Sequence, residues 1–301
     1  MNSDQVNWIA VDWGTTNLRC WAMSAQNDVL ASARSDQGMG VIAAGEHDFE
    51  SALLDLIGSW LKGHRTTPVY ACGMVGAKQG WIEAPYDLAP CPPRTSLIQA
   101  PTRDKSIDVF IHSGICQSSP ADVMRGEETQ IAGLLAIDPG YEGLVCLPGT
   151  HSKWVTVTEG GIESFRTYIT GELWSLLAEH SVLQHTTSSE GWCESAFLDA
   201  FQLSLNRPEE ILAQCFGLRA EALLNGLGGV ESRSRLSGLL LGVEIAGALN
   251  GLRSTRQITL IGSHTSASMY RSALETLNIS MSHVEVEKVT LAGLAASRAV
   301  E

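Results

Sequence analysis

The chain has 301 residues, of which 44% are hydrophobic and 18% charged, so it can bury a large core and form two domains. Its formal net charge of −13 repels nucleic acid, and no basic run offsets that charge. Residues 1–7 do not read as a signal peptide, and no segment offers about 20 consecutive apolar residues. Composition therefore excludes a nucleic-acid-binding protein, argues against a membrane role and predicts a cytoplasmic protein.

The seven cysteines are scattered, with no Cys-x-x-Cys pair and no clustered histidines beside them. This spacing supports neither a zinc site nor a disulfide framework. Cys20, Cys72 and Cys146 fall inside apolar runs, where a free thiol is expected to act as a small buried hydrophobe.

Residues 8–21 predict an apolar strand, a polar turn and a second strand, and the turn suits a phosphate. Gly14 permits the positive φ of a tight turn, and Thr15 and Thr16 offer hydrogen-bond donors. Asp12 stands at the strand end, where it could hold a Mg²⁺-bound water. Taken alone, the pattern is equally compatible with an ordinary β-hairpin.

Residues 143–157 repeat this pattern, with Gly149 and Thr150 in the turn and His151 and Lys153 after it. Two copies of one supersecondary unit imply a duplicated fold. Two such turns facing each other across a cleft would grip a polyphosphate from both sides. Leu147 stands in the second copy where Asp12 stands in the first.

The first half continues with a strand at 29–33, a helix at 48–61 and a buried strand at 68–73. A glycine-broken loop follows, and such loops often line ligand clefts in α/β folds. In it, Lys78 could meet an anion and Trp81 could stack on a sugar. A surface lysine and a packing tryptophan are the alternative interpretation.

Five prolines between residues 85 and 101 exclude a regular helix there, so we expect an irregular cover. Residues 107–112 are expected to be the last strand of the first half.

A turn then opens an amphipathic helix, with Arg125 and Gly126 followed by Glu127 and Glu128. Two acids in a first helical turn complement the macrodipole, for about 0.3–1 kcal/mol each. Alternatively, one of them is a general base beside Arg125. We favour Glu127 as that base, because it follows Gly126 directly.

The second half predicts a strand at 162–168, a helix after residue 172 and a helical insertion at about 190–230. A long helix at 231–252 carries glycines and other small residues at spacing four, which predicts close approach by a strand or ligand. Glu244 interrupts its apolar stretch, and a buried carboxylate must find a partner or shift its pKa. Pairing with an arginine such as Arg253 and acceptance of ribose hydroxyls are the two alternatives.

A strand at 258–262 mirrors the strand at 68–73 and ends in a loop of small residues. Gly262, Ser263 and Ser266 in this loop would let an adenine slide between backbone and helix. A strand near Val284 and a helix at 291–299 close the chain.

These residues resemble the sugar-kinase branch of the actin/Hsp70/hexokinase superfamily and, more narrowly, the 2-dehydro-3-deoxygalactonokinase family. The turn at Gly126 is similar to the Gly-Asp turn that supplies the base in the FGGY carbohydrate kinases. Five blocks in order carry the narrower match, at residues 12–19, 73–76, 124–130, 148–154 and 170–172.

The resemblance implies an α/β fold of duplicated ribonuclease-H-like (actin-like ATPase) domains, each with a mixed five-stranded sheet, with a cleft between them. The domains would be residues 1–125 and 126–301. It also implies ATP-dependent phosphorylation of the 6-hydroxyl of 2-dehydro-3-deoxy-D-galactonate, in galactonate breakdown. Another sugar acid as substrate, or a non-catalytic sugar-binding relative, is the alternative. Oligomeric state stays open, with a homodimer among the possibilities.

Site residues follow from the resemblance as expectations. Asp12 would position Mg²⁺ largely alone, since Leu147 replaces the second aspartate, and Arg19 would meet charge on the transferred group. The remaining roles are ATP phosphates at Gly14, Thr15, Thr16, Gly149, Thr150, His151 and Lys153; adenosine at Glu244, Gly262, Ser263 and Ser266; and the sugar acid at Lys78, Trp81, Arg125 and Glu128.

Overall fold

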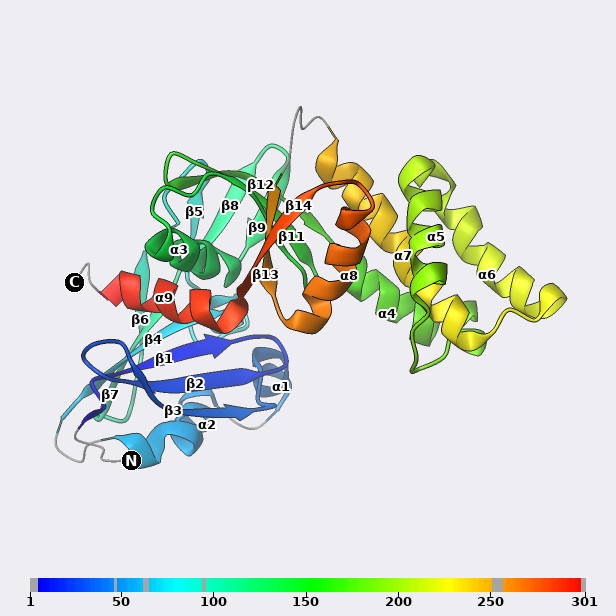
Figure 1. The fold of residues 1–301 in the computed structure, drawn as a ribbon. Helices are drawn as coiled ribbons and strands as arrows, with labels where there is room; N and C mark the ends of the chain where they lie inside the picture. The colour runs from blue at the N-terminus through cyan, green and yellow to red at the C-terminus, as the bar shows by residue number, and fades with distance from the viewer. Residues whose placement is uncertain (1–4, 46–47, 62–64, 94–95, 251–256, 299–301) are drawn as a thin grey trace. The chain divides into compact units, whose positions relative to one another are not determined.

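The computed structural model describes residues 5–45, 48–61, 65–93, 96–250 and 257–298, and these residues form two compact units. The first unit contains residues 1–142, 157–164 and 285–301, and the second contains 143–156 and 165–284. Neither unit is continuous in sequence, whereas the predicted domains 1–125 and 126–301 are. The duplicated α/β architecture is nevertheless visible, because each unit is built on its own mixed sheet (Figure 1).

The first unit is built on a six-stranded sheet in the order β3-β2-β1-β4-β7-β6. The strands are β1 Trp8–Trp13, β2 Leu18–Met23, β3 Val29–Ser35, β4 Thr67–Gly73, β6 Leu97–Ala100 and β7 Ile107–His112. β1 pairs antiparallel with β2 and parallel with β4, so the sheet is mixed. The prediction of five strands is wrong here, because the end of the proline-rich segment forms β6 and pairs antiparallel with β7.

Both faces of β1 are buried, which explains its continuous apolar run. Ile9 and Val11 belong to a large apolar cluster that also contains Leu53 of helix α2. Trp8 and Ala10, which alternate with them, belong to a second cluster with Leu294 of helix α9.

The helices of the first unit cover this sheet. They are α1 Met39–Ala44, α2 Phe49–Ile57, α3 Glu127–Ile137 and α9 Val286–Arg298, with short 3₁₀ turns η2 Gly58–Trp60 and η3 Met74–Gly76. α3 and α9 pack against each other through glycines (Figure 1). A Cβ at Gly133 would lie 1.7 Å from the carbonyl oxygen of Val289, so no side chain fits between these backbones.

A small sheet in the order β5-β8-β9 completes the first unit. Its strands are β5 Tyr86–Leu88, β8 Gly114–Ser118 and β9 Ala121–Met124. The prediction that residues 107–112 are the last strand of this half is therefore wrong, because β8 and β9 follow them. β8 and β9 form a hairpin, and α3 begins soon after β9 ends.

The second unit is built on the predicted five-stranded sheet, in the order β12-β11-β10-β13-β14, although residues 157–158 of β11, 161–164 of β12 and 285 of β14 belong to the first unit. The strands are β10 Gly143–Leu147, β11 Ser152–Thr158, β12 Gly161–Tyr168, β13 Gln257–Gly262 and β14 Ser280–Glu285. The helices are α4 Thr170–His180, α5 Glu194–Asn206, α6 Ile211–Asn225, α7 Gly229–Leu249 and α8 His264–Glu275, with 3₁₀ turns η4 Val182–His185 and η5 Pro208–Glu210.

The helical insertion is confirmed as α5 and α6, which pack on α7 (Figure 1). Two of the small residues of α7, Gly238 and Gly242, meet helix α5, whereas the prediction was a strand or a ligand. A Cβ at Gly238 would lie 2.2 Å from the carbonyl oxygen of Phe197, and one at Gly242 would lie 2.1 Å from Oγ of Ser204. Within the described ranges, no helix combines the length and apolar character needed to span a membrane. Cys20, Cys72 and Cys146 are buried free thiols, as predicted.

Candidate active site

The first glycine turn joins β1 to β2 and is supported by the start of α1. The backbone N–H of Gly14 donates to the carbonyl of Asn17, and the N–H of Met39 donates to the carbonyl of Gly14, both at 2.9 Å. A Cβ at Gly38 would lie 2.3 Å from the carbonyl oxygen of Thr15, so the support depends on glycine there. The predicted positive φ at Gly14 is wrong, because the left-handed glycines of the first unit lie elsewhere.

Asp12 lies directly before this turn and forms an ion pair with Arg19, which faces it across the β1–β2 pair. Nη2 of Arg19 is 2.9 Å from Oδ2 of Asp12, and the aspartate side chain is only 14% exposed. Burial raises the pKa of Asp12, and the Arg19 guanidinium opposes that rise. A carboxylate held this way gains from a second cation, so it fits the role of a metal-positioning group.

Two left-handed glycines bring three elements together beside Asp12. Gly73 ends β4 with a φ of +94°, and Gly126 precedes α3 with a φ of +109°. A Cβ at Gly73 would lie 2.6 Å from the carbonyl oxygen of Trp13 and 3.6 Å from Oδ1 of Asp12, while one at Gly126 would lie 3.3 Å from the Cα of Gly73. The ends of β1 and β4 therefore converge on the first turn of α3, where the two glutamates lie.

Glu127 and Glu128 have different surroundings although they are adjacent. Oε2 of Glu127 accepts a hydrogen bond of 3.1 Å from the N–H of Arg125, and the residue is half-buried. Glu128 is fully buried, and its Oε2 accepts a bond of 2.6 Å from the N–H of Gly126. Burial, and then the negative charge of Glu127, raise the pKa of Glu128 to about 7. Accessibility thus favours Glu127 as a base, and the predicted substrate contact of Glu128 would have to reach the interior.

Arg125 is buried, with 9% of its surface exposed, yet no carboxylate pairs with it in the described part of the chain. Its Nη2 donates to the carbonyl of Ala84 at 2.8 Å, and its guanidinium carbon lies 4.3 Å from the ring centroid of Tyr86. Nε and Nη1 have no hydrogen-bond partner. Two buried guanidinium nitrogens without a partner are costly, so this side chain fits an anion that arrives with the substrate.

The two other predicted sugar contacts, Lys78 and Trp81, differ in exposure. Lys78 is exposed, in the loop after η3. Trp81 packs instead: its ring is stacked on Phe49 at a centroid distance of 6.3 Å and meets Trp13 edge-on at the same distance. The interpretation of Trp81 as a packing residue is therefore the one these contacts support.

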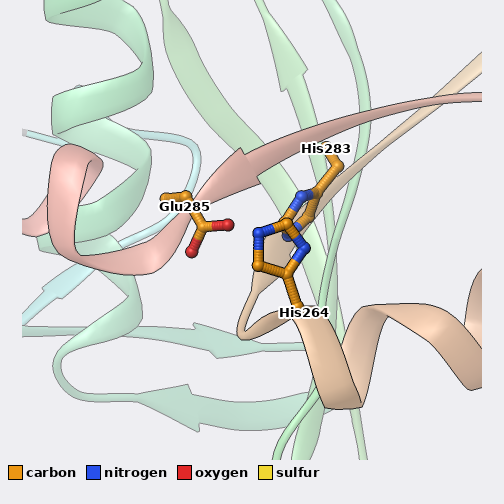
Figure 2. Close-up of side chains that lie close together, drawn as sticks. All are labelled: His264, His283 and Glu285. Atoms are coloured by element: carbon orange, nitrogen blue, oxygen red, sulfur yellow. The ribbon is translucent and has the colours of Figure 1, made fainter.

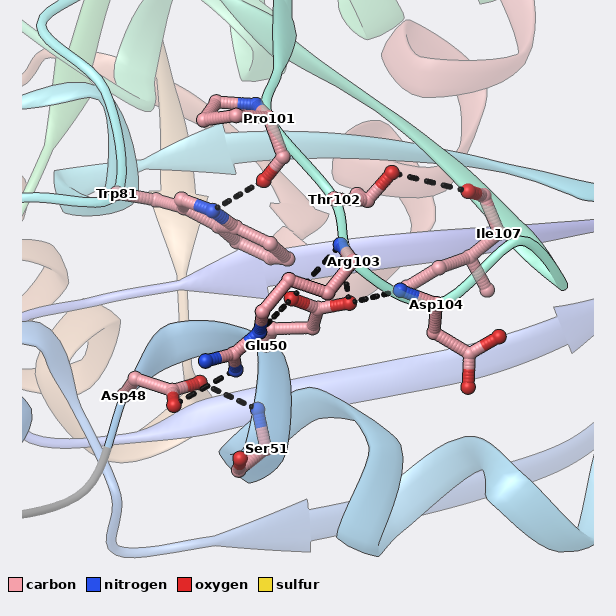
Figure 3. A network of polar contacts seen from close by, with 9 residues as sticks. All are labelled: Asp48, Glu50, Ser51, Trp81, Pro101, Thr102, Arg103, Asp104 and Ile107. Atoms are coloured by element: carbon pink, nitrogen blue, oxygen red, sulfur yellow. Dashed lines mark hydrogen bonds and ion pairs between the residues drawn. The ribbon is translucent and has the colours of Figure 1, made fainter.

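A network of polar contacts fixes Trp81 and the start of helix α2 (Figure 3). Trp81 donates through Nε1 to the carbonyl of Pro101 at 3.1 Å. Two residues on, the N–H of Arg103 and that of Asp104 donate to the buried carboxylate of Glu50, at 2.8 and 2.6 Å. Nε of Arg103 also donates to Glu50 at 2.9 Å. Helix α2, the loop before β7 and Trp81 are thus fixed together behind the first turn.

The second glycine turn joins β10 to β11 and is supported by the start of α4. The N–H of Glu172 donates to the carbonyl of Thr150 at 3.0 Å. A Cβ at Gly171 would lie 2.6 Å from the carbonyl oxygen of Gly149, so this contact also requires glycine. Nε2 of His151 is 2.5 Å from Oε2 of Glu172, and both side chains are half exposed.

Lys153 lies on β11 and is buried, with 6% of its surface exposed. Its neighbours Ser152 and Trp154 contact Tyr270 and Glu244 on one face of the sheet. Because side chains alternate along a strand, Lys153 points to the other face. The structure therefore separates Lys153 from the residues around Glu244.

The second unit contains a cavity of about 720 Å³, the size of a small-molecule site. Gly149 and Ser266 are the predicted residues that line it; Gly262 and Ser263 lie at the adjacent turn from β13 to α8. The other lining residues are Pro148, Thr170, Gly171, Trp174, Gly191, Trp192, Glu194, Arg233, Ser237, Leu240, Leu241, Thr265, Ser268, Met269, Tyr270 and Ser272. Most belong to helices and carry no motif, so only the fold could identify them.

Glu244 lies behind this cavity, and not among the residues that line it. The residue is 1% exposed, and its Oε1 accepts hydrogen bonds of 2.8 Å from Nε1 of Trp154 and from the hydroxyl of Tyr270. Burial raises the pKa of Glu244. Arg253, the predicted alternative partner, lies outside the described residues. Glu244 thus orients Tyr270, whose other side faces the cavity.

Two histidines far apart in sequence meet beside the turn from β13 to α8 (Figure 2). The rings of His264 and His283 have centroids 5.0 Å apart, and Nε2 of His283 is 3.0 Å from the carbonyl oxygen of Gly262. Glu285 follows two residues after His283 on β14. The sequence showed no clustered histidines, because residues 264 and 283 become neighbours only through the pairing of this part of the fold.

Comparisons with known proteins agree on one family. A family model described as 2-keto-3-deoxy-galactonokinase matches residues 12–297. A Rhizobium meliloti (strain 1021) protein named "Probable 2-dehydro-3-deoxygalactonokinase DgoK1" is 38% identical, over 97% of each chain. The 2-dehydro-3-deoxygalactonokinase of Escherichia coli (strain K12) is 33% identical, over 95% of this chain and 96% of its own.

Solved structures agree with this result. The "Crystal structure of a putative 2-dehydro-3-deoxygalactonokinase protein from Sinorhizobium meliloti" superposes with a TM-score of 0.88 at 37% identity, over 97% of this chain and 99% of that one. Component A of Acidaminococcus fermentans (R)-2-hydroxyglutaryl-CoA dehydratase shares the fold alone, with a TM-score of 0.50 at 12% identity, over 97% of this chain and 98% of that one.

Proposed function

The chain belongs to the 2-keto-3-deoxy-galactonokinase family, and from this premise we propose that it transfers the γ-phosphate of ATP to the 6-hydroxyl of 2-dehydro-3-deoxy-D-galactonate. The products are ADP and the 6-phosphorylated sugar acid, a step of galactonate breakdown. The observation that carries the proposal is the meeting of Asp12, Gly73 and Gly126 beside an accessible glutamate, in a chain that matches this family almost end to end.

The first unit supplies the reacting groups. Glu127 accepts the proton of the 6-hydroxyl, since it is the more accessible acid at the start of α3. Asp12 would hold Mg²⁺, and the metal would supply positive charge to neutralise the phosphates. Arg19, already beside Asp12, stabilises charge on the transferred group. Each assignment is supported by burial and contacts within this unit.

Arg125 binds the carboxylate of the sugar acid. A chain with a net charge of −13 needs a local cation for an anionic substrate, and Arg125 has two buried nitrogens without a partner. The Tyr86 ring and the Ala84 carbonyl fix the guanidinium plane, so its free edge is oriented before the substrate arrives. Lys78 is a second cation. It is exposed and lies in the loop that leads to Ala84, the residue that Arg125 contacts.

The second unit binds the nucleotide. Its cavity accepts adenosine beside Ser266, with Gly262 and Ser263 at the adjoining turn, and the turn at Gly149 and Thr150 donates to phosphate oxygens. We assign His151 and Lys153, which follow that turn, to the phosphates as well. The Gly14–Thr16 turn of the first unit offers donors of the same kind. Because ATP and a sugar acid are its substrates, we place the protein in the cytoplasm.

A coupled assay of ADP release, run over a panel of sugar acids with ATP and Mg²⁺, tests this function. We expect turnover with 2-dehydro-3-deoxy-D-galactonate, and little with the corresponding neutral sugar, which lacks the carboxylate. Arg125→Gln should raise KM for the sugar acid about 10²-fold and leave KM for ATP unchanged, because a charged hydrogen bond is lost from one substrate only.

Lys78→Gln is the matched control, since it removes the same charge from an exposed position. It should change KM for the sugar acid by less than about fivefold. Equal turnover of neutral and acidic sugars would refute the role of Arg125, and no turnover of any sugar acid would refute the kinase assignment.

A further inference from the structure

The helical insertion contains a second cavity, of about 350 Å³, that is separate from the nucleotide cavity. The two cavities share no lining residue. The second one lies between η4 with the turn after it, the middle of α6 and the start of α7, all within the second unit. Its lining includes Gln184, His185, Thr187, Ser188 and Arg219.

The charge of this cavity is opposite to that of the protein. Arg219 and His185 line it, and no aspartate or glutamate does, in a chain with a formal net charge of −13. A hollow that carries guanidinium and imidazole groups without a carboxylate attracts anions.

Arg219 differs from the other arginines of the helical region. Arg207 pairs with Glu210 at 3.1 Å, and Arg235 pairs with Glu221 at 2.6 Å. Arg233 lies 4.5 Å from the centroid of the Trp174 ring and donates to the carbonyl of Ser188. In the described ranges Arg219 has no such acid, carbonyl or ring, so its donors are available to a ligand.

The turn after η4 leaves one hydroxyl beside this hollow without a hydrogen-bond partner. The N–H groups of Thr186 and Thr187 and the hydroxyl of Thr186 all turn back to the carbonyl of Leu183, which fixes the turn after η4. The Thr187 hydroxyl is buried and has no hydrogen-bond partner. A buried hydroxyl without a partner costs free energy, and an anion in the cavity would satisfy it.

We propose that this cavity is a second ligand site, and that its ligand is a small organic phosphate bound by Arg219, with the Thr187 hydroxyl as a further donor. A phosphate group offers several acceptor oxygens to a planar guanidinium, which donates from more than one nitrogen. The volume of about 350 Å³ exceeds what inorganic phosphate needs, so it leaves room for an organic part of a few carbons.

Isothermal titration calorimetry with glycerol 3-phosphate tests this site in protein saturated with ADP and Mg²⁺, so that the nucleotide cavity is already filled. We expect one binding site, and weaker binding of inorganic phosphate. Arg219→Gln should weaken binding of glycerol 3-phosphate at least tenfold, and Thr187→Val several-fold, because each removes a donor to a charged group. Glycerol, which has no phosphate, should not bind.

Arg207→Gln is the control, since it makes the same charge change at an exposed arginine of the insertion that is already paired. It should bind glycerol 3-phosphate like the wild type, and circular dichroism should show that all three variants are folded. No heat with glycerol 3-phosphate in the wild type would overturn the proposal, and so would equal binding by the wild type, Arg219→Gln and Thr187→Val. Kinase activity is not the readout, so failure here leaves the proposed function untouched.

Discussion

The two glycine turns have the same strand-turn-strand pattern, but different residues precede them and different elements support them. Asp12 precedes the first turn and is paired with Arg19, whereas Leu147, which is 4% exposed, precedes the second. Helix α1 supports the first turn, and α4 supports the second. A carboxylate therefore directly precedes the first turn, whereas an apolar residue directly precedes the second, which also lines the large cavity.

In the proposed function the two turns have different roles. Both would offer backbone N–H groups to phosphate oxygens, so phosphate binding would be common to the two copies. Only the first turn is directly preceded by a carboxylate, so the chemical step would depend on the first unit. The comparison makes opposite predictions for equivalent positions, and these can be tested in pairs.

The largest effect is expected from Asp12→Ala paired with Leu147→Ala. Loss of the carboxylate that directly precedes the first turn should lower kcat about 10³-fold while circular dichroism shows an intact fold. Leu147→Ala should leave kcat within a few-fold and lower the free energy of unfolding by about 2–5 kcal/mol, because it empties part of a core. Steady-state kinetics and urea unfolding of both variants measure this. If Asp12→Ala keeps near-normal activity with Mg²⁺, the metal assignment is wrong.

The next effect concerns the two acids at the start of α3. Glu127→Gln keeps the shape of the side chain but cannot take up the proton, so kcat should fall about 10²-fold with little change in KM for ATP. Glu128→Gln should retain activity within a few-fold, since Glu128 is fully buried and holds Gly126. If Glu128→Gln is instead the inactive variant, the base is the next residue along. If both variants are active, the base lies outside this pair.

A smaller effect is expected when alanine replaces the glycine that packs against each turn, Gly38 for the first and Gly171 for the second. Gly38→Ala should displace the first turn and lower kcat, and Gly171→Ala should displace the second and raise KM for ATP, each by about tenfold. Gly217→Ala is the control, because a Cβ there meets nothing within 4 Å. Kinetics with ATP varied at saturating sugar acid separate the two effects. If Gly38→Ala and Gly171→Ala change kcat and KM for ATP in the same way, the two turns do not have different roles.

The sequence predicted the two glycine turns and the acids at the start of α3, because the patterns that indicate them are local. Glycine-threonine turns between apolar strands and acids in a first helical turn are patterns of a few residues, and they placed Asp12 and Glu127 correctly on their elements. The strand β6 was missed because the prolines between residues 85 and 101 led us to expect an irregular segment, whereas Leu97–Ala100 lies between Pro93 and Pro101 and contains no proline.

Other features were missed because they depend on residues that are distant in sequence. The cavity residues on α4, α5, α7 and α8 come together only in the folded chain, as do His264 and His283. The surroundings of Arg125 likewise depend on the folded chain, because Ala84 and Tyr86 contact its guanidinium from a distant part of the sequence. The sequence could name Arg125 as a cation, but it could not show that its partners leave two nitrogens for a ligand.

The last prediction contrasts the buried glutamates of the two units, Glu128 and Glu244, through the pH dependence of stability. The pKa of Glu128 is raised from 4.5 to about 7 in the folded protein, so the folded state holds a proton that the unfolded state releases. Its contribution is complete below pH 4.5, declines as the pH rises to about 7 and then stays constant. The total is about 3 kcal/mol.

Glu128→Gln cannot titrate, so the decline in the free energy of unfolding between pH 5 and pH 8 should be about 3 kcal/mol smaller in this variant than in the wild type. Burial also raises the pKa of Glu244, but hydrogen bonds from Trp154 and Tyr270 stabilise its charged form, so Glu244→Gln should change the pH dependence less. Urea unfolding of the three proteins at both pH values measures the differences. An unchanged pH dependence in Glu128→Gln would mean that Glu128 is already ionised at pH 5 in the folded protein. Glu128 would then be a second negative charge beside Glu127, and the separation of an accessible base from a neutral buried acid would fail.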